Sequence, residues 1–380
     1  MEQRTIAGRH VTFCVPAFNG ASVIGDALAS IRQQTHQDFT VLISDDCSQD
    51  GTPDVCTGFL ADDRFALYVQ PRRLGWVENC NWLLAKAASD FVCILPQDDA
   101  LAPTFAAKLL DALVPPNRVM AFPDVEWFGA RQGVSSASTV EGNRVERARQ
   151  FLRSHYDGLA FRGLLRRRVL ETAGGLRANR TGGYAADIGW LCRIACCGDM
   201  VRVPEALYRK RYDPGSVSGR WGQLPADQLA EAWCMHCSEI AQSLLDLKFQ
   251  PDELRALAPA WVERVLGLGF PDLRGIMVSL PPDMQRDLIA RTSQTFVLTY
   301  ARQRGDMPVP ASACEDFADL LTALSFEALS NPASPPSPEP PVHGLEYRVA
   351  RTPRNLVNFL FGRPLKAHSA QMRATQTPAK

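Results

Sequence analysis

Two adjacent carboxylates, Asp98 and Asp99, directly follow an apolar run in the segment FVCILPQDD, residues 91–99. An apolar run of this length is typical of a strand that is buried on both faces. Like charges at the edge of such a core repel each other, because the low dielectric screens them weakly. A divalent cation such as Mg²⁺ or Mn²⁺ would relieve the repulsion, since these hard ions prefer oxygen ligands. We therefore predict that Asp98 and Asp99 hold a metal ion.

Two further polar clusters follow apolar runs, after residues 11–15 and 39–44. Amphipathic helical patterns at residues 22–34 and 77–88 separate the runs. This alternation predicts an α/β fold in which helices flank a mostly parallel sheet. Because ligands bind beyond the carboxyl ends of such strands, we expect the three clusters to gather at one edge. The clusters comprise Pro16, Ala17, Phe18 and Asn19, then Asp45 and Asp46, then Gln97, Asp98 and Asp99.

Two long motifs surround these clusters. Residues 15–52 read VPAFNGASVIGDALASIRQQTHQDFTVLISDDCSQDGT, and residues 75–99 read GWVENCNWLLAKAASDFVCILPQDD. In this order and at this spacing they resemble the opening of the family 2 inverting glycosyltransferases, which have the GT-A (Rossmann-like) fold. The resemblance covers residues 11–129 and continues with fewer matches over residues 145–220. It implies transfer of a sugar from a nucleotide-diphosphate sugar to an acceptor hydroxyl with inversion, with Mg²⁺ or Mn²⁺ as cofactor.

The resemblance also implies the partners: a UDP-, dTDP- or GDP-linked donor, and a glycan or lipid-linked acceptor in surface polysaccharide or glycan biosynthesis. Phe18 would stack on the base. Asp45 or Asp46 would accept a hydrogen bond from the base or the ribose, and the family pattern favours Asp46. Arg209 and Arg211 would close over the diphosphate, with a solvated basic turn as the alternative. The expected nucleotide-sugar site comprises Pro16, Ala17, Phe18, Asn19, Asp45, Asp46, Asn81, Gln97, Asp98, Arg209 and Arg211.

One carboxylate in the second half of the chain suits a catalytic base. Asp187 stands in GGYAADIGWLCRIA, which resembles the Glu-Asp motif of the family, with Ala186 in place of the usual first acid. Inverting transfer needs a base that takes the proton of the acceptor hydroxyl, and a carboxylate is suited to this. The alternative interpretation makes Asp187 the N-cap of the helix that follows.

Two departures from the family pattern support an alternative function. Pro96 stands where many relatives have the first Asp of an Asp-x-Asp-Asp cluster, and Ala186 replaces an acid. They suggest a non-catalytic sugar-nucleotide-binding or scaffold protein of the same fold. The presence of Asp98, Asp99 and Asp187 favours the enzyme. A nucleotidyltransferase is disfavoured, because no Gly-rich phosphate loop follows the first strand.

Composition narrows the remaining classes. Among 380 residues, Lys plus Arg and Asp plus Glu each number 41, which argues against a nucleic-acid partner. The 11 cysteines are scattered, several of them inside apolar runs, as is typical of free thiols in a reducing compartment. The first ten residues contain no apolar segment of the signal-peptide kind, so we expect a cytoplasmic protein.

The chain divides by composition into four parts. We predict a GT-A domain over residues 8–221 and a helical region over residues 222–330. Residues 331–342 contain six prolines and predict an extended linker. The tail, residues 343–380, is basic with the apolar centre NLVNFLFG, and it predicts peripheral contact with the inner face of the cell membrane. A docking peptide for a partner or a disordered tail is the alternative.

Overall fold

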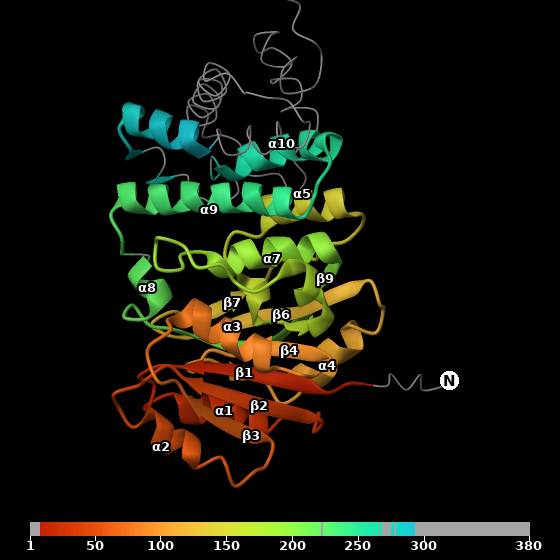
Figure 1. Ribbon diagram of the computed structural model, residues 1–380, viewed down its shortest axis with the longest axis vertical. Helices are drawn as coiled ribbons and strands as arrows, with labels where there is room; N and C mark the ends of the chain where they lie inside the picture. The colour runs from red at the N-terminus through yellow and green to blue at the C-terminus, as the bar shows by residue number, and fades with distance from the viewer. Residues whose placement is uncertain (1–7, 222, 266, 268–274, 277–278, 293–380) are drawn as a thin grey trace, which may run out of the picture.

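Figure 1 shows the computed structural model, which describes residues 8–221, 223–265, 267, 275–276 and 279–292. A sheet with helices on both sides forms one half, and stacked helices form the other. The first strands and helices alternate as expected: β1 (Val11–Ala17), α1 (Ile24–Arg32), β2 (Phe39–Asp45), α2 (Thr52–Thr57), β3 (Phe65–Val69), α3 (Trp76–Lys86) and β4 (Phe91–Ile94). The chain continues through β5 (Ala100–Leu101), α4 (Phe105–Ala112), β6 (Arg118–Gly129), β7 (Gly133–Ser135), α5 (Arg144–Ser154), the 3₁₀ turn η1 (Leu159–Arg162), β8 (Leu164–Arg166), α6 (Leu170–Ala173), α7 (Ala186–Cys197), β9 (Asp199–Tyr212), α8 (Val217–Trp221), α9 (Ala226–Asp246) and α10 (Pro251–Val265).

The strands form one sheet in the order β3-β2-β1-β4-β8-β6-β9-β5, with β7 paired to β6. β1 pairs in parallel with both β2 and β4, and β2 pairs in parallel with β3. Ala17 therefore lies opposite Asp45, and Asp45 opposite Val69, at the carboxyl ends of their strands. The predicted α/β sheet with flanking helices is confirmed, and its parallel half brings the first polar clusters to one edge.

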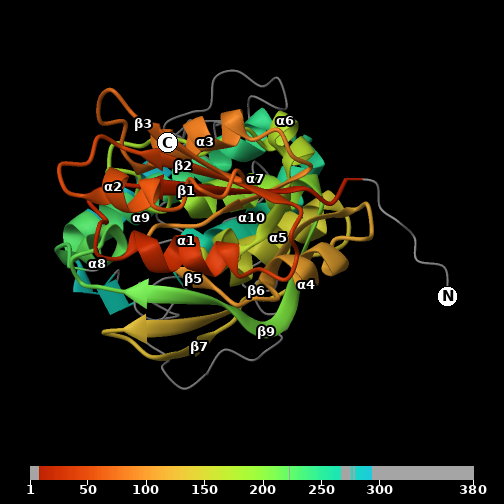
Figure 2. The same ribbon diagram turned by 90° about the horizontal axis from the view of Figure 1, so that it is seen from below.

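The second half of the sheet is mixed. β8 runs antiparallel to β4 and to β6, whereas β6 and β9 are parallel, with register shifts around Pro123 and Asp124. Figure 2 shows β6, β7 and β9 at the opposite end of the sheet from β3. The sequence predicts only helices and turns over residues 145–220, so β8 and β9 are new. β9 contains Pro204 and a mostly exposed middle, and it lacks the apolar run that marks β1 and β4.

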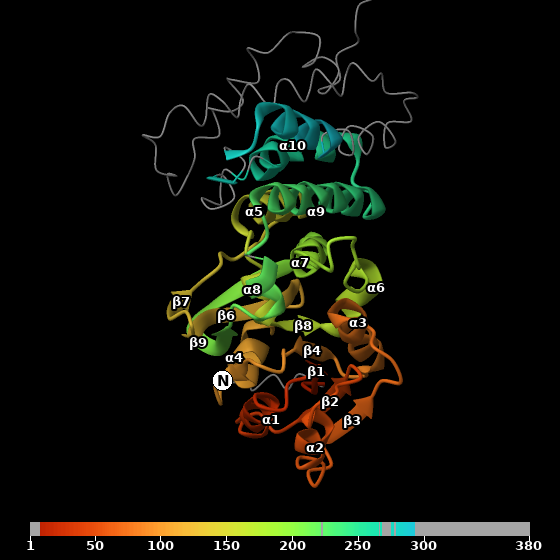
Figure 3. The same ribbon diagram turned by 90° about the vertical axis from the view of Figure 1, so that its left-hand side faces the viewer.

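Helices continue in layers beyond the sheet. Figures 1 and 3 show α7 nearest the strands, then α5 and α9, then α10. The buried Arg264 of α10 donates hydrogen bonds to the backbone oxygens of Leu152 and His155 at the carboxyl end of α5, at 3.1 and 3.0 Å. A cation is favourable at that end of a helix dipole. Among the described residues, no helix has both the length and the apolar character needed to cross a bilayer.

In the helical region predicted over residues 222–330, the described part contains α9 and α10, and residues 293–330 lie outside the described residues. The boundary at residue 221 stays a prediction. The linker, residues 331–342, and the tail, residues 343–380, lie outside the described residues. The cysteines in the described part of the chain are free thiols, and most of them are buried.

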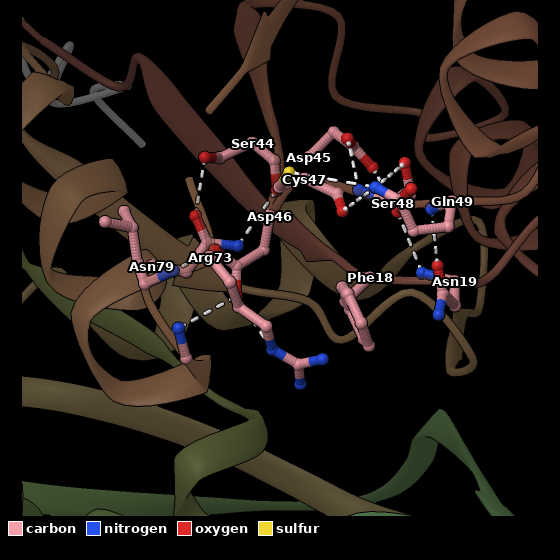
Figure 4. Close-up of polar contacts among 12 residues, drawn as sticks. Phe18, Asn19, Ser44, Asp45, Asp46, Cys47, Ser48, Gln49, Arg73 and Asn79 are labelled. Atoms are coloured by element: carbon pink, nitrogen blue, oxygen red, sulfur yellow. Dashed lines mark hydrogen bonds and ion pairs between the residues drawn. The ribbon is translucent and has the colours of Figure 1, made fainter. Parts of the chain in front are cut away.

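A buried polar network fixes the carboxyl end of β2. The Ser44 hydroxyl donates to Asn79 Oδ1 at 2.5 Å, and Asn79 Nδ2 donates to the Ser44 backbone oxygen at 3.0 Å. Gln70 Nε2 donates to Ser44 Oγ at 2.8 Å. Figure 4 shows the Ser44–Asn79 pair beside the loop that follows β2. Because these bonds tie α3 and the end of β3 to β2, they set the position of the Asp45–Asp46 pair that follows.

Candidate active site

The loops after β1 and β2 hold each other through Asp45 and Asn19. The buried Asp45 carboxylate accepts hydrogen bonds from Ser48 N at 3.0 Å and from Ser48 Oγ at 2.5 Å. Asn19 N donates to the same Ser48 hydroxyl, and Asn19 Oδ1 accepts from Gln49 N at 2.8 Å. Figure 4 shows both groups directed into the loop. Asp45 and Asn19 therefore shape the site, and neither presents an unpaired carboxylate or carbonyl to a ligand.

Asp46 faces the loop before α3. Its two carboxylate oxygens accept hydrogen bonds from Leu74 N at 2.6 Å and Gly75 N at 2.9 Å. Arg73 Nε lies 4.0 Å from Asp46, and the guanidinium carbon of Arg73 lies 3.3 Å from the centre of the Phe18 ring. Figure 4 shows the Arg73 side chain reaching from Asp46 toward Phe18. Arg73 thus lies between Phe18 and Asp46, and the nucleoside site predicted for these two residues stays a prediction.

Gln97 and Asn81 each bind a backbone segment. Gln97 Nε2 donates to the Phe18 backbone oxygen at 2.9 Å, while Gln97 Oε1 accepts from Phe18 N at 2.8 Å. This pair fastens the Phe18 loop to the loop that carries Asp98. Asn81 forms the same kind of pair with the backbone of Leu176, at 3.0 and 2.8 Å. These amides are engaged in the structure, so it places Gln97 and Asn81 as positioning residues for neighbouring loops.

Asp98 and Asp99 have very different surroundings. Asp99 is 1% exposed and accepts hydrogen bonds from the Tyr208 hydroxyl at 2.8 Å and from Arg211 N at 2.9 Å. Burial raises the pKa of the Asp99 carboxyl, and the nearby Lys210 ammonium counteracts this. Asp98 is half-buried, and within the described part of the chain no hydrogen bond or ion pair engages it. Asp98 is therefore the carboxylate with free oxygens, and Asp99 ties its loop to β9.

Side chains alternate along β9, and this alternation separates its basic residues. Arg209 pairs with Glu126 at 3.1 Å, and Arg211 packs on Phe128 with its guanidinium carbon 4.8 Å from the ring centre. Lys210 lies on the other face of the strand, together with Tyr208. Arg209 and Arg211 thus engage Glu126 and Phe128 on one face of β9, whereas Lys210 shares the other face with Tyr208, the hydroxyl donor to Asp99. The site residues predicted from the basic run 209–211 are Arg209 and Arg211, and the separate placement of Lys210 becomes predictable only once β9 is known to be a strand.

The surroundings of Lys210 shift the pKa of its side chain. Burial lowers the pKa of the Lys210 ammonium, and the nearby Arg162 guanidinium lowers it further. The carboxylates of Asp99, Asp98 and Asp187 oppose this shift, so all three lie within electrostatic reach of the amine.

Asp187 lies in the first turn of α7. Its Oδ2 is 3.9 Å from Arg162 Nη1, and its Oδ1 accepts from Ile188 N at 3.0 Å. Burial raises the pKa of the Asp187 carboxyl, and Arg162 opposes the rise. The helix is preceded by Ala185 as its N-cap residue, without a side-chain cap, so the N-cap interpretation of Asp187 is wrong. Arg162, at the end of η1, is a second functional candidate that the sequence did not reveal.

The loops after the parallel strands of this GT-A-type sheet thus carry Phe18, Asp46 and the unpaired Asp98, and α7 supplies the half-buried Asp187. The sequence profile described as "Glycosyl transferase family 2" matches residues 12–174. The succinoglycan biosynthesis protein ExoO of Rhizobium meliloti (strain 1021) is 30% identical over 311 residues, which cover 79% of this chain and 85% of ExoO. The chain belongs to glycosyl transferase family 2.

Other relatives match over shorter stretches. The putative teichuronic acid biosynthesis glycosyltransferase TuaG of Bacillus subtilis (strain 168) is 30% identical over 90 residues, so the chain spans 36% of TuaG. The crystal structure of S. aureus TarS 1–349 in complex with UDP-GlcNAc is similar with a TM-score of 0.60, at 16% identity over 84% of this chain and 88% of that one. This likeness shows the shared fold.

The Tyr208–Asp99 bond yields a stability prediction. We expect Tyr208→Phe to lower the free energy of unfolding by about 1–3 kcal/mol, because a buried carboxylate oxygen loses its donor. Tyr212→Phe, four residues further along the same strand face, removes a hydroxyl for which the described residues offer no hydrogen bond, and it should cost less than about 0.5 kcal/mol. Urea denaturation of both variants tests this. Equal losses would contradict a structural role for the Asp99 bond.

Proposed function

We propose that this chain is a metal-dependent inverting glycosyltransferase that moves a sugar from a nucleotide-diphosphate sugar to an acceptor hydroxyl. The observation that carries the proposal is that the loops after the parallel strands carry Phe18, Asp46 and the unpaired Asp98, while Asp187, in the first turn of α7, lies within electrostatic reach of Lys210. The site thereby offers a group of suitable chemistry to each part of the reactants: to the nucleoside, to the diphosphate and to the reacting hydroxyl.

Phe18, Asp46 and Arg73 suit the nucleoside. An aromatic ring offers a face for a base, and the Asp46 carboxylate can accept from an imide N–H or a ribose hydroxyl. The Arg73 guanidinium now covers one face of Phe18, so a base that stacks there takes the place of the guanidinium. Since 57% of the Arg73 side chain is exposed, its displacement disturbs little of the surrounding packing.

Asp98 and Lys210 suit the diphosphate. Free carboxylate oxygens at Asp98, with Asp99 fixed behind, fit a hard cation such as Mg²⁺ or Mn²⁺. The described residues contain no group of three or more potential His, Cys, Asp or Glu ligands, so the donor phosphates would complete the coordination. When bound, the ion would neutralise charge on the leaving diphosphate. The Lys210 ammonium supplies a second positive charge on the same side. The site has one acid fewer than in many relatives, because Pro96 stands in place of the first Asp of their cluster.

Asp187 is suited to act as the catalytic base. The acceptor oxygen attacks the anomeric carbon, the bond from that carbon to the diphosphate oxygen breaks, and the nucleoside diphosphate leaves with the electron pair. Asp187 takes the proton that the acceptor hydroxyl loses. Its raised pKa favours this role, because a carboxylate is a stronger base when its pKa lies closer to the working pH. Arg162 keeps the carboxylate charged and oriented in the free enzyme.

The cellular role that we propose is the assembly of a surface polysaccharide or related glycan. The names of ExoO and TuaG, which refer to succinoglycan and teichuronic acid biosynthesis, support this role. The donor that the site chemistry supports is a UDP-, dTDP- or GDP-linked sugar. The acceptor is then a hydroxyl of a growing glycan, free or lipid-linked.

The raised pKa of Asp187 yields a pH prediction. Transfer requires the ionised carboxylate, so the rate should rise with pH up to the raised pKa of Asp187 and then level off. Arg162→Gln removes the cation that lowers this pKa, and it should move the acid limb to higher pH. Asp187→Asn should abolish the limb and reduce transfer by about 10²–10⁴-fold while donor binding persists. Rates between pH 4 and 9 with saturating donor test this, and transfer retained within threefold in Asp187→Asn would remove Asp187 as the base.

Lys210 and Arg209 give a matched pair of variants. Lys210→Met should weaken binding of UDP, dTDP or GDP by about tenfold, because a charge-assisted contact to the diphosphate is lost. Arg209→Met, on the opposite face of β9, should change the affinity by less than about twofold. Isothermal titration in the presence of Mn²⁺ measures both. The reverse ranking would return the diphosphate role to Arg209.

A further inference from the structure

Three aromatic side chains from separate segments meet beside this site. Trp76 begins α3, Tyr184 precedes α7, and Trp221 ends α8. The ring centres of Trp76 and Trp221 are 6.3 Å apart, and those of Tyr184 and Trp221 are 5.4 Å apart. The interplanar angles are 62° and 71°, so the rings pack edge to face and do not stack on one another.

The aromatic trio differs from the aromatic core of the protein. The core tryptophans Trp233 and Trp261 are 2% and 0% exposed, whereas Trp76, Tyr184 and Trp221 are only half-buried. Burial on this scale leaves part of each ring in contact with solvent. Edge-to-face packing also leaves ring faces that the other two rings do not cover.

Hydrogen bonds within the loop before α7 support the trio. The Trp76 indole N–H donates to Gly182 O at 3.3 Å, and a Cβ at Gly183 would lie 2.4 Å from that indole nitrogen. Gly183, at φ +84°, therefore permits the close approach. Asn179 holds the loop from inside, since its Nδ2 donates to Tyr184 O at 2.9 Å and its Oδ1 accepts from Gly183 N at 2.8 Å.

The trio lies between the two ends of the proposed reaction. Gly75, which immediately precedes Trp76, donates its N–H to Asp46 on the nucleoside side. Tyr184 stands three residues before Asp187. Burial raises the pKa of Tyr184 to about 12, and the charges of Cys237 and Asp187 add to the rise. An acceptor must place its hydroxyl at Asp187, so its sugar ring arrives next to these aromatic rings.

We propose that Trp76, Tyr184 and Trp221 form a stacking platform for the sugar ring of a saccharide acceptor. This inference rests on the proposed function and assigns its acceptor site. A pyranose has an apolar C–H face and a rim of hydroxyls, and an electron-rich aromatic face complements the C–H groups. The hydroxyl rim is then left free to reach Asp187. The platform favours a saccharide acceptor, because half-buried rings near Asp187 offer both an apolar face and access to solvent.

Intrinsic fluorescence of the full chain tests the platform. Methyl glycosides of glucose, galactose, mannose and N-acetylglucosamine, and β-linked disaccharides of the same sugars, are titrated in the presence of Mn²⁺ and UDP, dTDP or GDP. We expect a saturable change with at least one saccharide. Trp221→Ala should weaken the affinity for that saccharide by about tenfold. Trp221→Phe, which keeps an aromatic ring, should bind it with an affinity within about threefold of the wild type.

Trp82→Ala is the matched control. Trp82 is half-buried in α3 and packs on Tyr68 at 5.0 Å, away from the trio, so its loss should leave saccharide binding unchanged. Nucleotide affinity of each variant, measured by isothermal titration, reports whether the protein is folded. Nucleotide binding without binding of any saccharide, or equal losses in Trp221→Ala and Trp82→Ala, would overturn the platform alone. Saccharide binding that depends on Trp221, without binding of any nucleoside diphosphate, would instead defeat the proposed transferase.

Discussion

Charge balance at the carboxyl edge of the sheet constrains the rest of this site. Asp98, Asp99 and Asp187 lie within electrostatic reach of Lys210, and Arg162 lies beside Asp187. Carboxylates so close to a low-dielectric core are tolerated only with compensating donors or cations. The Tyr208 hydroxyl and the Arg211 N–H supply such donors to Asp99, and in doing so they fix β9 against the loop after β4. Because side chains alternate along a strand, this attachment also directs Lys210 toward the carboxylates.

The acidic residues of the site divide into two kinds. Asp45, Asp46 and Asp99 are buried, and each accepts two hydrogen bonds that shape a loop. Asp98 is half-buried without a partner in the described part of the chain, and Asp187 is held only by its neighbour's N–H and a long contact to Arg162. A preorganised scaffold with a few unpaired groups lowers the cost of ordering when a ligand binds. Asp98, which has no partner among the described residues, and Asp187, which is only loosely held, are thus the carboxylates available to a metal ion and to a reacting hydroxyl.

Local patterns predict the parallel half of the fold, because β1, β2 and β4 are apolar runs that lead directly into polar loops. They also predict the meeting of Phe18 with Asp46. They fail for β9, whose polar sequence and shifted register depend on pairing with β6, a contact between distant segments. The positions of Lys210 and Arg209 follow from that pairing, so local patterns do not reveal which residues of the basic run 209–211 share a strand face with Tyr208. The diphosphate role of Arg209 and Arg211 stays a prediction. Local patterns also do not predict the role of Arg162, because its contact with Asp187 joins segments that are distant in the sequence.

The account depends on a nucleoside diphosphate and a divalent ion binding together at Asp98. Isothermal titration of UDP, dTDP and GDP, each with and without Mn²⁺, measures this directly in the wild type, in Asp98→Ala and in the exposed control Asp63→Ala. We expect Mn²⁺ to tighten the binding of at least one nucleotide by about tenfold or more. Of the two variants, only Asp98→Ala should lose this increase in affinity. Failure of all three nucleotides to bind, or an undiminished Mn²⁺ effect in Asp98→Ala, would contradict the account.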